Sequence, residues 1–441
     1  MLAPCLLFPP WIGQHRLFLV IVSPATVFIT SSMLFLLLKI LIGIIIGLSI
    51  GAFFFMKYFP SFGAKAPKKG TTAFKESDHY KDNQFFYSIT DIEKKPKKPY
   101  KALSNALWFI KNKIFRNPRL RPEEDLPFKK YEFKDLDSNV TSVTWFGHSS
   151  LLLEISGKRL LLDPMFGKIP SPVPYFGTRR FNQAPIDVEK IPSIDAVIFS
   201  HDHYDHLDYW TIKRIKDKVN HFFVPLGVAG HLERWNIPKN KITEIDWWNE
   251  VNFEGINLVC TPTKHFSGRS FANHTSLSCS WVIYNKKKKI FFSGDGDYEK
   301  HFKEIGEKYG PFDLTLMECG QYDIRWPNIH MFPEQSVQAH IDLKGKVMIP
   351  IHWATFALAF HDWDDSINRV IKEGEKKNIQ ISTPFIGERV ILNDNAEYPS
   401  KKWWSELVHN NSEKDIYISE EIVDSQESYK DDYIKDIKKA N

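Results

Sequence analysis

Cysteine and strong net charge are both scarce in this sequence. Its 441 residues include only four cysteines, none in a Cys-x-x-Cys pair, which excludes a disulfide framework and leaves the redox compartment open. The formal net charge is +5 and no basic stripe dominates, so nothing indicates a nucleic-acid surface. Hydrophobic residues make up 43% and charged residues 25%, as in ordinary globular proteins, and the length suits one catalytic domain with appendages.

The first feature that is present is a long apolar run at residues 33–56, interrupted by Lys39 and a few small residues. A helix of about 20 residues crosses the hydrocarbon core of a membrane, and Lys39 lies near one end, where it can snorkel to the headgroups. An uncleaved anchor, a cleaved signal peptide and a buried core helix all fit such a run. Its length exceeds that of a signal's apolar region, which favours a single-pass membrane anchor.

Residues 1–32 form an N-terminal extension of undetermined role. Met33 would give a more usual start, which N-terminal sequencing of the native protein tests. The lysines that follow the apolar run favour a cytoplasmic catalytic domain, whereas Lys39 and the pair His15 and Arg16 argue the other way. The side of the membrane therefore stays open.

Three regions follow the apolar run. Residues 57–139 are rich in lysine, proline and aromatic residues, which predicts a linker and an arm wrapped on the domain, with a short helix at residues 102–115. Strand and helix patterns then alternate over residues 140–399, which predicts the main folded domain. Residues 400–441 are polar and charged, which predicts a tail.

The densest chemistry lies at residues 200–206, which read Ser-His-Asp-His-Tyr-Asp-His after an apolar run that predicts a buried strand. So many imidazoles and carboxylates are too costly to bury unpaired. In an extended loop, His201 and His203 point the same way and can share one ion, whereas Asp205 and His206 turn toward a second. Nitrogen and oxygen donors without thiolate suit zinc, iron or manganese, so the loop predicts a metal site.

A metal pair needs more ligands than this loop supplies, and three other predicted strands end on candidates. These are His265, Asp295 in a glycine-rich turn, and His352. A lone histidine at a strand end is more often structural. Three such ends in a chain that already holds the His-x-His-x-Asp-His loop favour ligands instead.

The order of these motifs resembles the metallo-β-lactamase superfamily, which implies an α/β fold, an αββα sandwich with the metals at one edge. Several separated segments resemble more closely the family of phospholipases D that hydrolyse N-acylphosphatidylethanolamine. Those segments are residues 143–166, 171–181, 200–209, 224–227, 246–248, 310–314, 325–326 and 351–359. The resemblance covers roughly residues 140–393 and leaves out the anchor and the tail. A related bacterial branch, lactonases acting on ascorbate phosphate, shares the fold and some motifs.

The resemblance implies a role for each matching residue. Two zinc ions would be bound, with these ligands: His201, His203 and His265 on one, Asp205, His206 and His352 on the other, and Asp295 bridging them. Asp163 would orient a ligand histidine, and His148 would support the site. Tyr204 and His330 would contact the phospholipid. The implied catalytic residues are Asp205, Asp295, His330 and Asp163.

Some positions depart from the family's pattern. Gly-Asp-Gly-Asp-Tyr at residues 294–298 replaces Gly-Asp-Thr-Gly-Tyr; Asp297 could be an outer group of the metal site or the N-cap of the next helix, and we prefer the cap. Glu318 and Cys319 replace apolar or proline residues, and Pro174 stands where the family's lipid-contacting segment can carry glutamine. The headgroup and acyl preferences are therefore open.

Together these features predict a membrane-anchored dinuclear zinc hydrolase that releases phosphatidic acid and a headgroup alcohol from N-acylphosphatidylethanolamine-type phospholipids. The alternative on the same fold is a metal-dependent hydrolase of a small phosphorylated or lactone substrate. A metal-dependent nuclease would need a basic stripe, and a non-catalytic membrane scaffold would have lost a ligand. The expected partners are a phospholipid substrate and the membrane, with no nucleic acid; the resemblance also admits a homodimer.

Overall fold

The computed structural model describes residues 24–64, 71–87, 118–173, 175–269, 273–393 and 397–407, with side chains described from residue 33 onward. The chain divides into two compact units, Met1–Phe59 and Pro60–Asn441. The predicted helix at residues 102–115 and most of the predicted tail lie outside the described residues.

The first unit contains one long helix, α1 (Pro24–Tyr58). A proline at the first helical position suits the start of a helix, and Pro60 soon after its end prevents its continuation. Within it, Met33–Tyr58 is a candidate membrane span of 26 residues, about 39 Å at 1.5 Å per residue. None of that span is buried within the described part of the chain.

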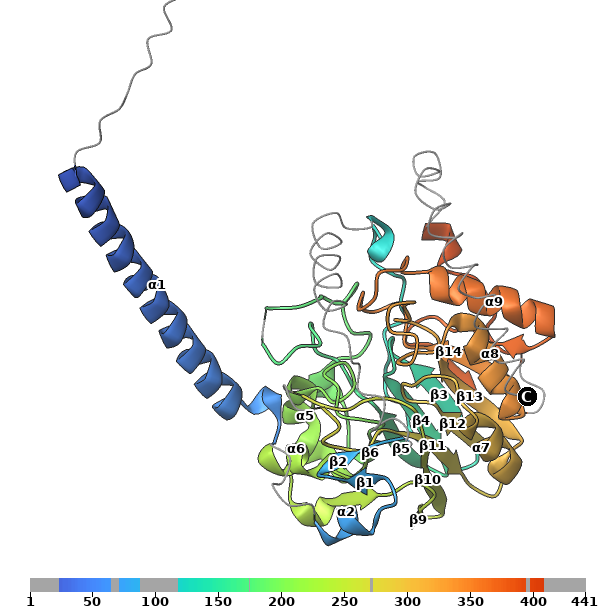
Figure 1. Ribbon diagram of the computed structural model, residues 1–441. Coiled ribbons are helices and arrows are strands. Elements are labelled where there is room, and N and C mark those ends of the chain that lie inside the picture. Colours follow the sequence, from blue (N-terminus) through green and yellow to red (C-terminus); the bar gives the residue numbers. More distant parts are fainter. Residues whose placement is uncertain are drawn as a thin grey trace, which may run out of the picture. The chain divides into compact units, whose positions relative to one another are not determined.

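The second unit is built on two sheets of seven strands each (Figure 1). The first has the order β16-β3-β4-β5-β6-β7-β8, antiparallel from β16 to β5 and parallel from β5 to β8. Its strands are β3 (Ser142–Trp145), β4 (Leu151–Ile155), β5 (Lys158–Leu162), β6 (Ile194–Ile198), β7 (Val219–Pro225), β8 (Ile242–Ile245) and β16 (Arg389–Ile391).

The second sheet repeats this plan in the order β9-β10-β11-β12-β13-β14-β15. It is antiparallel from β9 to β12 and parallel from β12 to β15. Its strands are β9 (Glu250–Phe253), β10 (Ile256–Pro262), β11 (Cys279–Tyr284), β12 (Lys289–Phe292), β13 (Phe312–Glu318), β14 (Gly345–Ile351) and β15 (Gln380–Ile381). The sequence showed no repeat by eye, because the two halves share strand order rather than residues.

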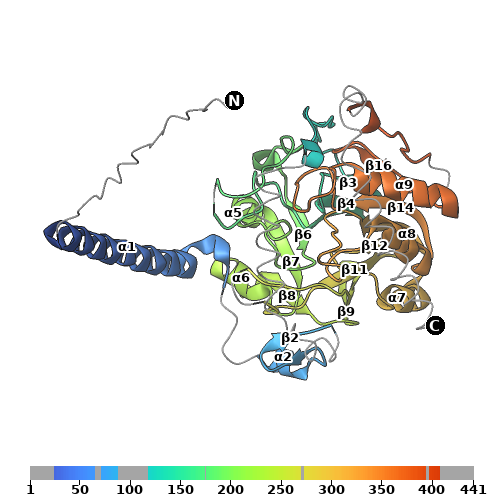
Figure 2. The ribbon, with the colours of Figure 1, turned by 45° about the horizontal axis from the view of Figure 1, so that its top comes forward.

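Helices cover the outer faces of both sheets, which gives four layers in the order helix, sheet, sheet, helix (Figure 2). The first sheet carries α5 (Tyr209–Ile215), which continues as a 3-10 turn over Lys216–Lys218, and α6 (Ala229–Arg234). The second carries α7 (His301–Tyr309), α8 (Pro333–Asp342) and α9 (Asp365–Lys377). The predicted α/β sandwich of αββα type is confirmed.

Alternation along the strands of the first sheet explains why it is buried on both faces. On β4, Leu151 and Leu153 join the core between the sheets, whereas Leu152 joins the core beneath α5 and α6. On β6, Ile198 joins the core between the sheets, and Val197 joins the core beneath α5 and α6. Successive side chains of a strand point to opposite faces, so a continuous apolar run suits a sheet with partners on both sides.

The alternation of strands and helices predicted over residues 140–399 is present. Short elements escaped the sequence patterns, including α6 and the edge strands β8, β9, β15 and β16. The arm region also contains more regular structure than predicted. Its described elements are a 3-10 turn (Pro60–Phe62), α2 (Thr72–Glu76), a hairpin of β1 (Tyr80–Lys81) and β2 (Gln84–Phe85), and a 3-10 turn (Pro118–Leu120).

Candidate metal centre

Ends of strands from both sheets meet at one place in the second unit. The loop of residues 200–206 follows β6, and His265, Asp295 and His352 follow β10, β12 and β14. In four overlapping groups, one ligand atom from each member lies within 4.8 Å of the others. The groups are His201, His203 and His265; His148, Asp205, His206 and His352; Asp295, Glu318, His330 and His352; and Asp163, His201 and His206. All predicted metal ligands are therefore brought together; their roles as ligands remain predictions.

The first group consists of three imidazoles whose nitrogens face one another. His203 Nδ1 lies 2.9 Å from His201 Nε2 and 3.2 Å from His265 Nε2. Burial lowers the pKa of all three rings, to about 4 for His203 and well below the ordinary value for the other two. Neutral rings offer nitrogen lone pairs, and these contacts bring the nitrogens of three rings within reach of one cation. The group therefore fits a metal with three nitrogen ligands.

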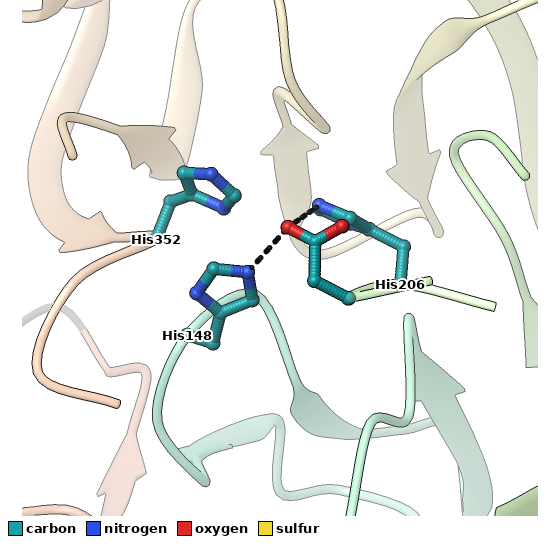
Figure 3. Close-up of side chains that lie close together, drawn as sticks. His148, His206 and His352 are labelled. Carbon is teal, nitrogen blue, oxygen red and sulfur yellow. Dashed lines mark hydrogen bonds and ion pairs between the residues drawn. The ribbon is translucent and has the colours of Figure 1, made fainter. Parts of the chain in front are cut away.

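The second group surrounds the carboxylate of Asp205 with imidazoles, as Figure 3 shows for His148, His206 and His352. His148 Nε2 lies 2.9 Å and His206 Nε2 lies 3.6 Å from Asp205 Oδ2. His148 and His352 also tie the two sheets together, because the His352 N–H donates to the His148 carbonyl over 2.8 Å. The sequence assigned His148 a supporting role, and its ring now lies in the same cluster as the predicted ligands.

Asp295 lies between the two groups. Its Oδ2 is 3.0 Å from His206 Nε2 and 3.8 Å from His201 Nε2, and its Oδ1 is 3.2 Å from His352 Nδ1. Burial raises the pKa of this carboxyl to about 6. The preceding Gly294 has φ +56°, and a Cβ there would lie 2.7 Å from Ser200 Cβ, so only glycine lets this turn approach the metal loop.

The surrounding carboxylates also favour a cation. Burial alone would lower the pKa of His206, but Asp295, Asp205 and Asp163 raise it well above its ordinary value. Conversely, burial would raise the pKa of Asp205, but His206 and His148 hold it well below the usual range. The field that favours an imidazolium here equally favours a metal ion on a neutral imidazole.

Groups outside the cluster fix the other nitrogen of several ligand candidates. Nδ1 lies 2.9 Å from Ser200 Oγ in His201, 2.7 Å from Asp163 Oδ2 in His206, and 2.9 Å from the Ile329 carbonyl in His265. Such bonds select the tautomer whose Nε2 lone pair faces the metal. This supports the orienting role predicted for Asp163, which also accepts from the Ser200 N–H over 2.8 Å.

His330 is paired with a residue that the sequence noted only as a departure. His330 Nδ1 lies 2.9 Å from Glu318 Oε2, and Glu318 Oε1 accepts from the Gly296 N–H over 2.7 Å. Burial raises the pKa of Glu318 well above its ordinary value and lowers that of His330. The directions of these shifts favour a protonated Glu318 carboxyl beside a neutral His330 ring. The pair can therefore store one proton at the edge of the metal centre.

Tyr204, predicted to contact substrate, has its hydroxyl engaged. It donates to the Arg269 carbonyl, and the Arg269 guanidinium lies 4.1 Å from the centre of its ring. Burial raises the pKa of this phenol to about 12, so it stays protonated. Any contact of Tyr204 with a substrate would use the face or edge of the ring.

The preferred role of Asp297 as a helix cap is wrong. Helix α7 begins at His301 with Lys300 at its N-cap, and no side chain caps it. Asp297 instead accepts from Lys264 Nζ over 2.9 Å, next to the candidate ligand His265. The turn after β12 pairs with the segment that follows β10, where Asp297 and Lys264 form an isolated bridge, so Asp297 lies before the start of the helix.

Sequence reasoning missed a ring of supporting residues that have no motif of their own. They are Ser149, whose Oγ lies 3.0 Å from His352 Nδ1, together with Ser200, Asp202, His231, Arg269 and Glu318. Ser200 and Asp202 stand in the metal loop itself, Ser149 follows His148, and Glu318 was noted as a departure from the family's pattern. His231 and Arg269 come from other parts of the chain and gave no signal.

Comparison with known proteins places this centre in a family. The description "Beta-lactamase superfamily domain" matches residues 158–353. An uncharacterised protein of Mycobacterium tuberculosis is 38% identical over 281 residues, which cover 63% of this chain and 76% of that protein. A metal-dependent hydrolase of Sulfurisphaera tokodaii is 30% identical over 238 residues, 53% of this chain and 92% of that protein. The N-acyl-phosphatidylethanolamine-hydrolyzing phospholipase D 1 of Caenorhabditis elegans is 32% identical over 228 residues, 49% of this chain and 64% of that protein.

Proposed function

The chain belongs to the metallo-β-lactamase superfamily, as a metal-dependent hydrolase, and we propose that it is a membrane-anchored dinuclear zinc phosphodiesterase. Its substrates would be N-acylphosphatidylethanolamine-type phospholipids, cleaved to phosphatidic acid and the headgroup alcohol. The observation that carries the proposal is the pair of ligand groups joined through Asp295. The 32% identity to the nematode phospholipase D supports the choice of substrate.

The two metal sites would use the predicted ligands. One ion would be held by His201, His203 and His265, and the other by Asp205, His206 and His352, with Asp295 shared between them. When bound, two such ions supply positive charge for the phosphate oxygens and lower the pKa of water toward neutrality. Asp205 and Asp295 contribute two negative charges, so a zinc pair leaves the centre cationic, as a singly charged phosphodiester requires.

The leaving alkoxide needs a proton, and His330 is placed to provide it. We assign the donor to His330 Nε2, with the proton replaced at Nδ1 from the buried carboxyl of Glu318, which lies 2.9 Å away. Because burial raises the pKa of Glu318 and so favours its protonated form, the pair can start the reaction with the proton it must give. Glu318 then finishes as a carboxylate; a solvent proton taken up at His330 Nε2 returns the Nδ1 proton to Glu318 and restores the pair.

The anchor suits a lipid substrate. A hydrolase tethered by a membrane-spanning α1 meets its substrate at a high effective concentration in two dimensions. The anchor alone does not identify the substrate, and an assay decides the substrate class.

The test uses full-length protein in detergent, loaded with zinc, with and without a chelator. N-acylphosphatidylethanolamine and phosphatidylcholine are offered in mixed micelles, and phosphatidic acid and free headgroup are followed by mass spectrometry. We expect phosphatidic acid from the N-acylated lipid, abolished by the chelator. Zinc-loaded protein that cleaves neither lipid would contradict the proposal and favour a small phosphorylated or lactone substrate.

A matched pair of variants distinguishes loss of the metal centre from a general loss of folding. Asp295→Asn removes the shared carboxylate and should abolish both turnover and full zinc loading. His221→Gln changes a half-buried histidine on β7, whose Nε2 lies 2.8 Å from Thr243 Oγ1, and should leave both unchanged.

A further inference from the structure

The five residues that follow the first unit, 60–64, are packed into the second unit and are called the exit segment here. They come two residues after the end of α1 at Tyr58 and form a 3-10 turn, Pro60–Phe62, followed by Gly63 and Ala64. Ser61 and Gly63 are buried. This burial is unusual for the link between an anchor and its domain, which is ordinarily solvated.

One hydrogen-bond path runs from the exit segment to the backbone of the metal loop. Arg269 Nη2 donates to the Ser61 carbonyl over 2.8 Å. The other terminal nitrogen, Nη1, donates to the carbonyls of Asp202 and Leu207, each over 2.7 Å. Asp202 and Leu207 bracket the segment that contains His203, Asp205 and His206, so one guanidinium holds both ends of the loop and the exit segment together.

A second path reaches the side chain of the same aspartate. The Ala64 N–H donates to His231 Nδ1 over 2.9 Å, which leaves the ring proton on Nε2. That nitrogen lies 3.3 Å from Asp202 Oδ2, and Asp202 Oδ1 accepts from the Gly268 N–H over 2.7 Å. The two paths use different residues, one Arg269 and the other His231. Both end on Asp202, which stands between the candidate ligands His201 and His203.

The packing around Arg269 makes the exit segment hard to replace by water. The guanidinium is buried, and Trp235 lies beneath it at 5.3 Å while donating from Nε1 to the Pro60 carbonyl over 2.8 Å. The charge of the guanidinium is met by three main-chain carbonyls and by the rings of Tyr204 and Trp235. A buried cation that loses one of these acceptors pays a large desolvation penalty.

We propose that the exit segment is a positioning element of the metal centre. Acting through Arg269 and His231, it fixes the backbone and the side chain of Asp202, and thereby the direction in which His201 and His203 present their nitrogens. The proposal rests on the metal centre of the proposed function and adds a coupling: a disturbance at the base of the anchor should weaken metal binding. Arg269, His231 and Asp202 are positioning residues in this scheme, since none of them is a proposed ligand.

Gly63 provides a test from the exit-segment side. Its φ is +72°, and a Cβ at this position would lie 2.1 Å from His231 Nδ1, so Gly63→Ala must displace either the segment or the ring. Gly47→Ala is the matched control, because an added Cβ at Gly47 in α1 meets nothing within 4 Å. Both variants are made in the full chain and compared with the wild type in detergent.

The measurement is the zinc dissociation constant, from competition with a chromogenic chelator, alongside the unfolding midpoint of the metal-free protein. Loss of a group that orients a ligand typically weakens metal binding about 10- to 100-fold. We expect about a tenfold or larger loss of zinc affinity in Gly63→Ala and none in Gly47→Ala. A merely structural role would lower the metal-free midpoint and leave the affinity unchanged, and that result would overturn the proposal.

Two further outcomes are decided by the same experiment. If Gly63→Ala does not fold, Trp235→Phe replaces it, because it removes the hydrogen bond to the Pro60 carbonyl and keeps an aromatic ring beneath the guanidinium. Weaker zinc binding supports the coupling, and unchanged binding overturns it. Wild-type protein that binds no zinc would instead overturn the metal centre itself.

Discussion

The two halves of the hydrolase domain share a strand plan but contribute to the metal centre in different ways. The first half supplies Asp163 after β5 and a compact loop after β6 that contains His201, His203, Asp205 and His206. The second half supplies scattered residues after β10, β12, β13 and β14, with up to 34 positions between them. The same architecture therefore supports one concentrated and one dispersed set of ligands.

This difference shows what holds each set in place. The loop of the first half is fixed at both ends: Asp163 holds Ser200, and Asp208 caps α5 by accepting from the Trp210 and Thr211 N–H groups, while Arg269 binds the carbonyls of Asp202 and Leu207. The second set converges because β12, β13 and β14 are parallel neighbours whose ends reach the same edge of the sheet. β10 runs in the same direction, since β11 is antiparallel to both β10 and β12. The first set depends on loop geometry and the second on strand register.

The largest expected effect tests whether the halves contribute equally to one ion. His201→Ala removes an imidazole from the concentrated set, and His265→Ala removes one from the dispersed set, both from the same group of three. Each should lower the zinc content from about two ions to about one per chain and reduce turnover about a thousandfold, because charge stabilisation at the phosphate is lost. Metal analysis and turnover of the purified variants provide the measurement. Two ions retained in either variant would show that the trio is not a shared site.

A smaller effect tests whether proton transfer is a property of the second half alone. Glu318→Gln keeps the size of the side chain and a polar contact to His330 Nδ1 but cannot pass on a proton. We expect kcat to fall about 100-fold, with KM and zinc content nearly unchanged, since general acid catalysis is worth about 10²- to 10⁴-fold. Steady-state kinetics with a substrate whose leaving group needs no proton offers the control, because the variant should then recover most of its rate. A variant with wild-type kcat would remove Glu318 from the reaction.

The smallest effect extends the comparison to acid stability. His340 on α8 of the second half is buried against Thr315, with 2.7 Å between Nδ1 and Oγ1, and burial lowers its pKa to about 4. The unfolded chain, with an ordinary histidine pKa near 6.5, takes up this proton first as the pH falls. The stability contributed by the neutral ring is complete above pH 6.5 and is lost between about 6.5 and 4.

We therefore expect the free energy of unfolding to fall by about 1.4 kcal/mol per pH unit across this window for His340 alone. Urea unfolding of the wild type and His340→Gln at several pH values measures the contribution, and the variant should show a shallower slope. His221→Gln on β7 of the first half, where the ring is half-buried, should flatten the slope much less. Equal slopes in the wild type and His340→Gln would contradict the assignment.

Much of the fold and of the centre was predictable because it depends on local pattern. Apolar runs predicted the strands, and amphipathic patterns predicted the helices. The crowding of histidine and aspartate at residues 200–206 indicated a metal site without any information on the residues that lie near it in space. His265, Asp295 and His352 could be added because each follows a predicted strand. The cap assigned to Asp297 failed because its partner, Lys264, is 33 positions away.

The sequence by itself determined which side chains can bind a metal, since donor type and spacing are properties of the chain. Only the tertiary structure decided which groups support them. His330 meets Glu318 in a buried pair, and Ser61 meets Arg269 across 208 positions, through contacts that no local pattern encodes. The reason is physical: a ligand atom is set by its residue, whereas its orientation and protonation are set by neighbours that the folded sheets bring together.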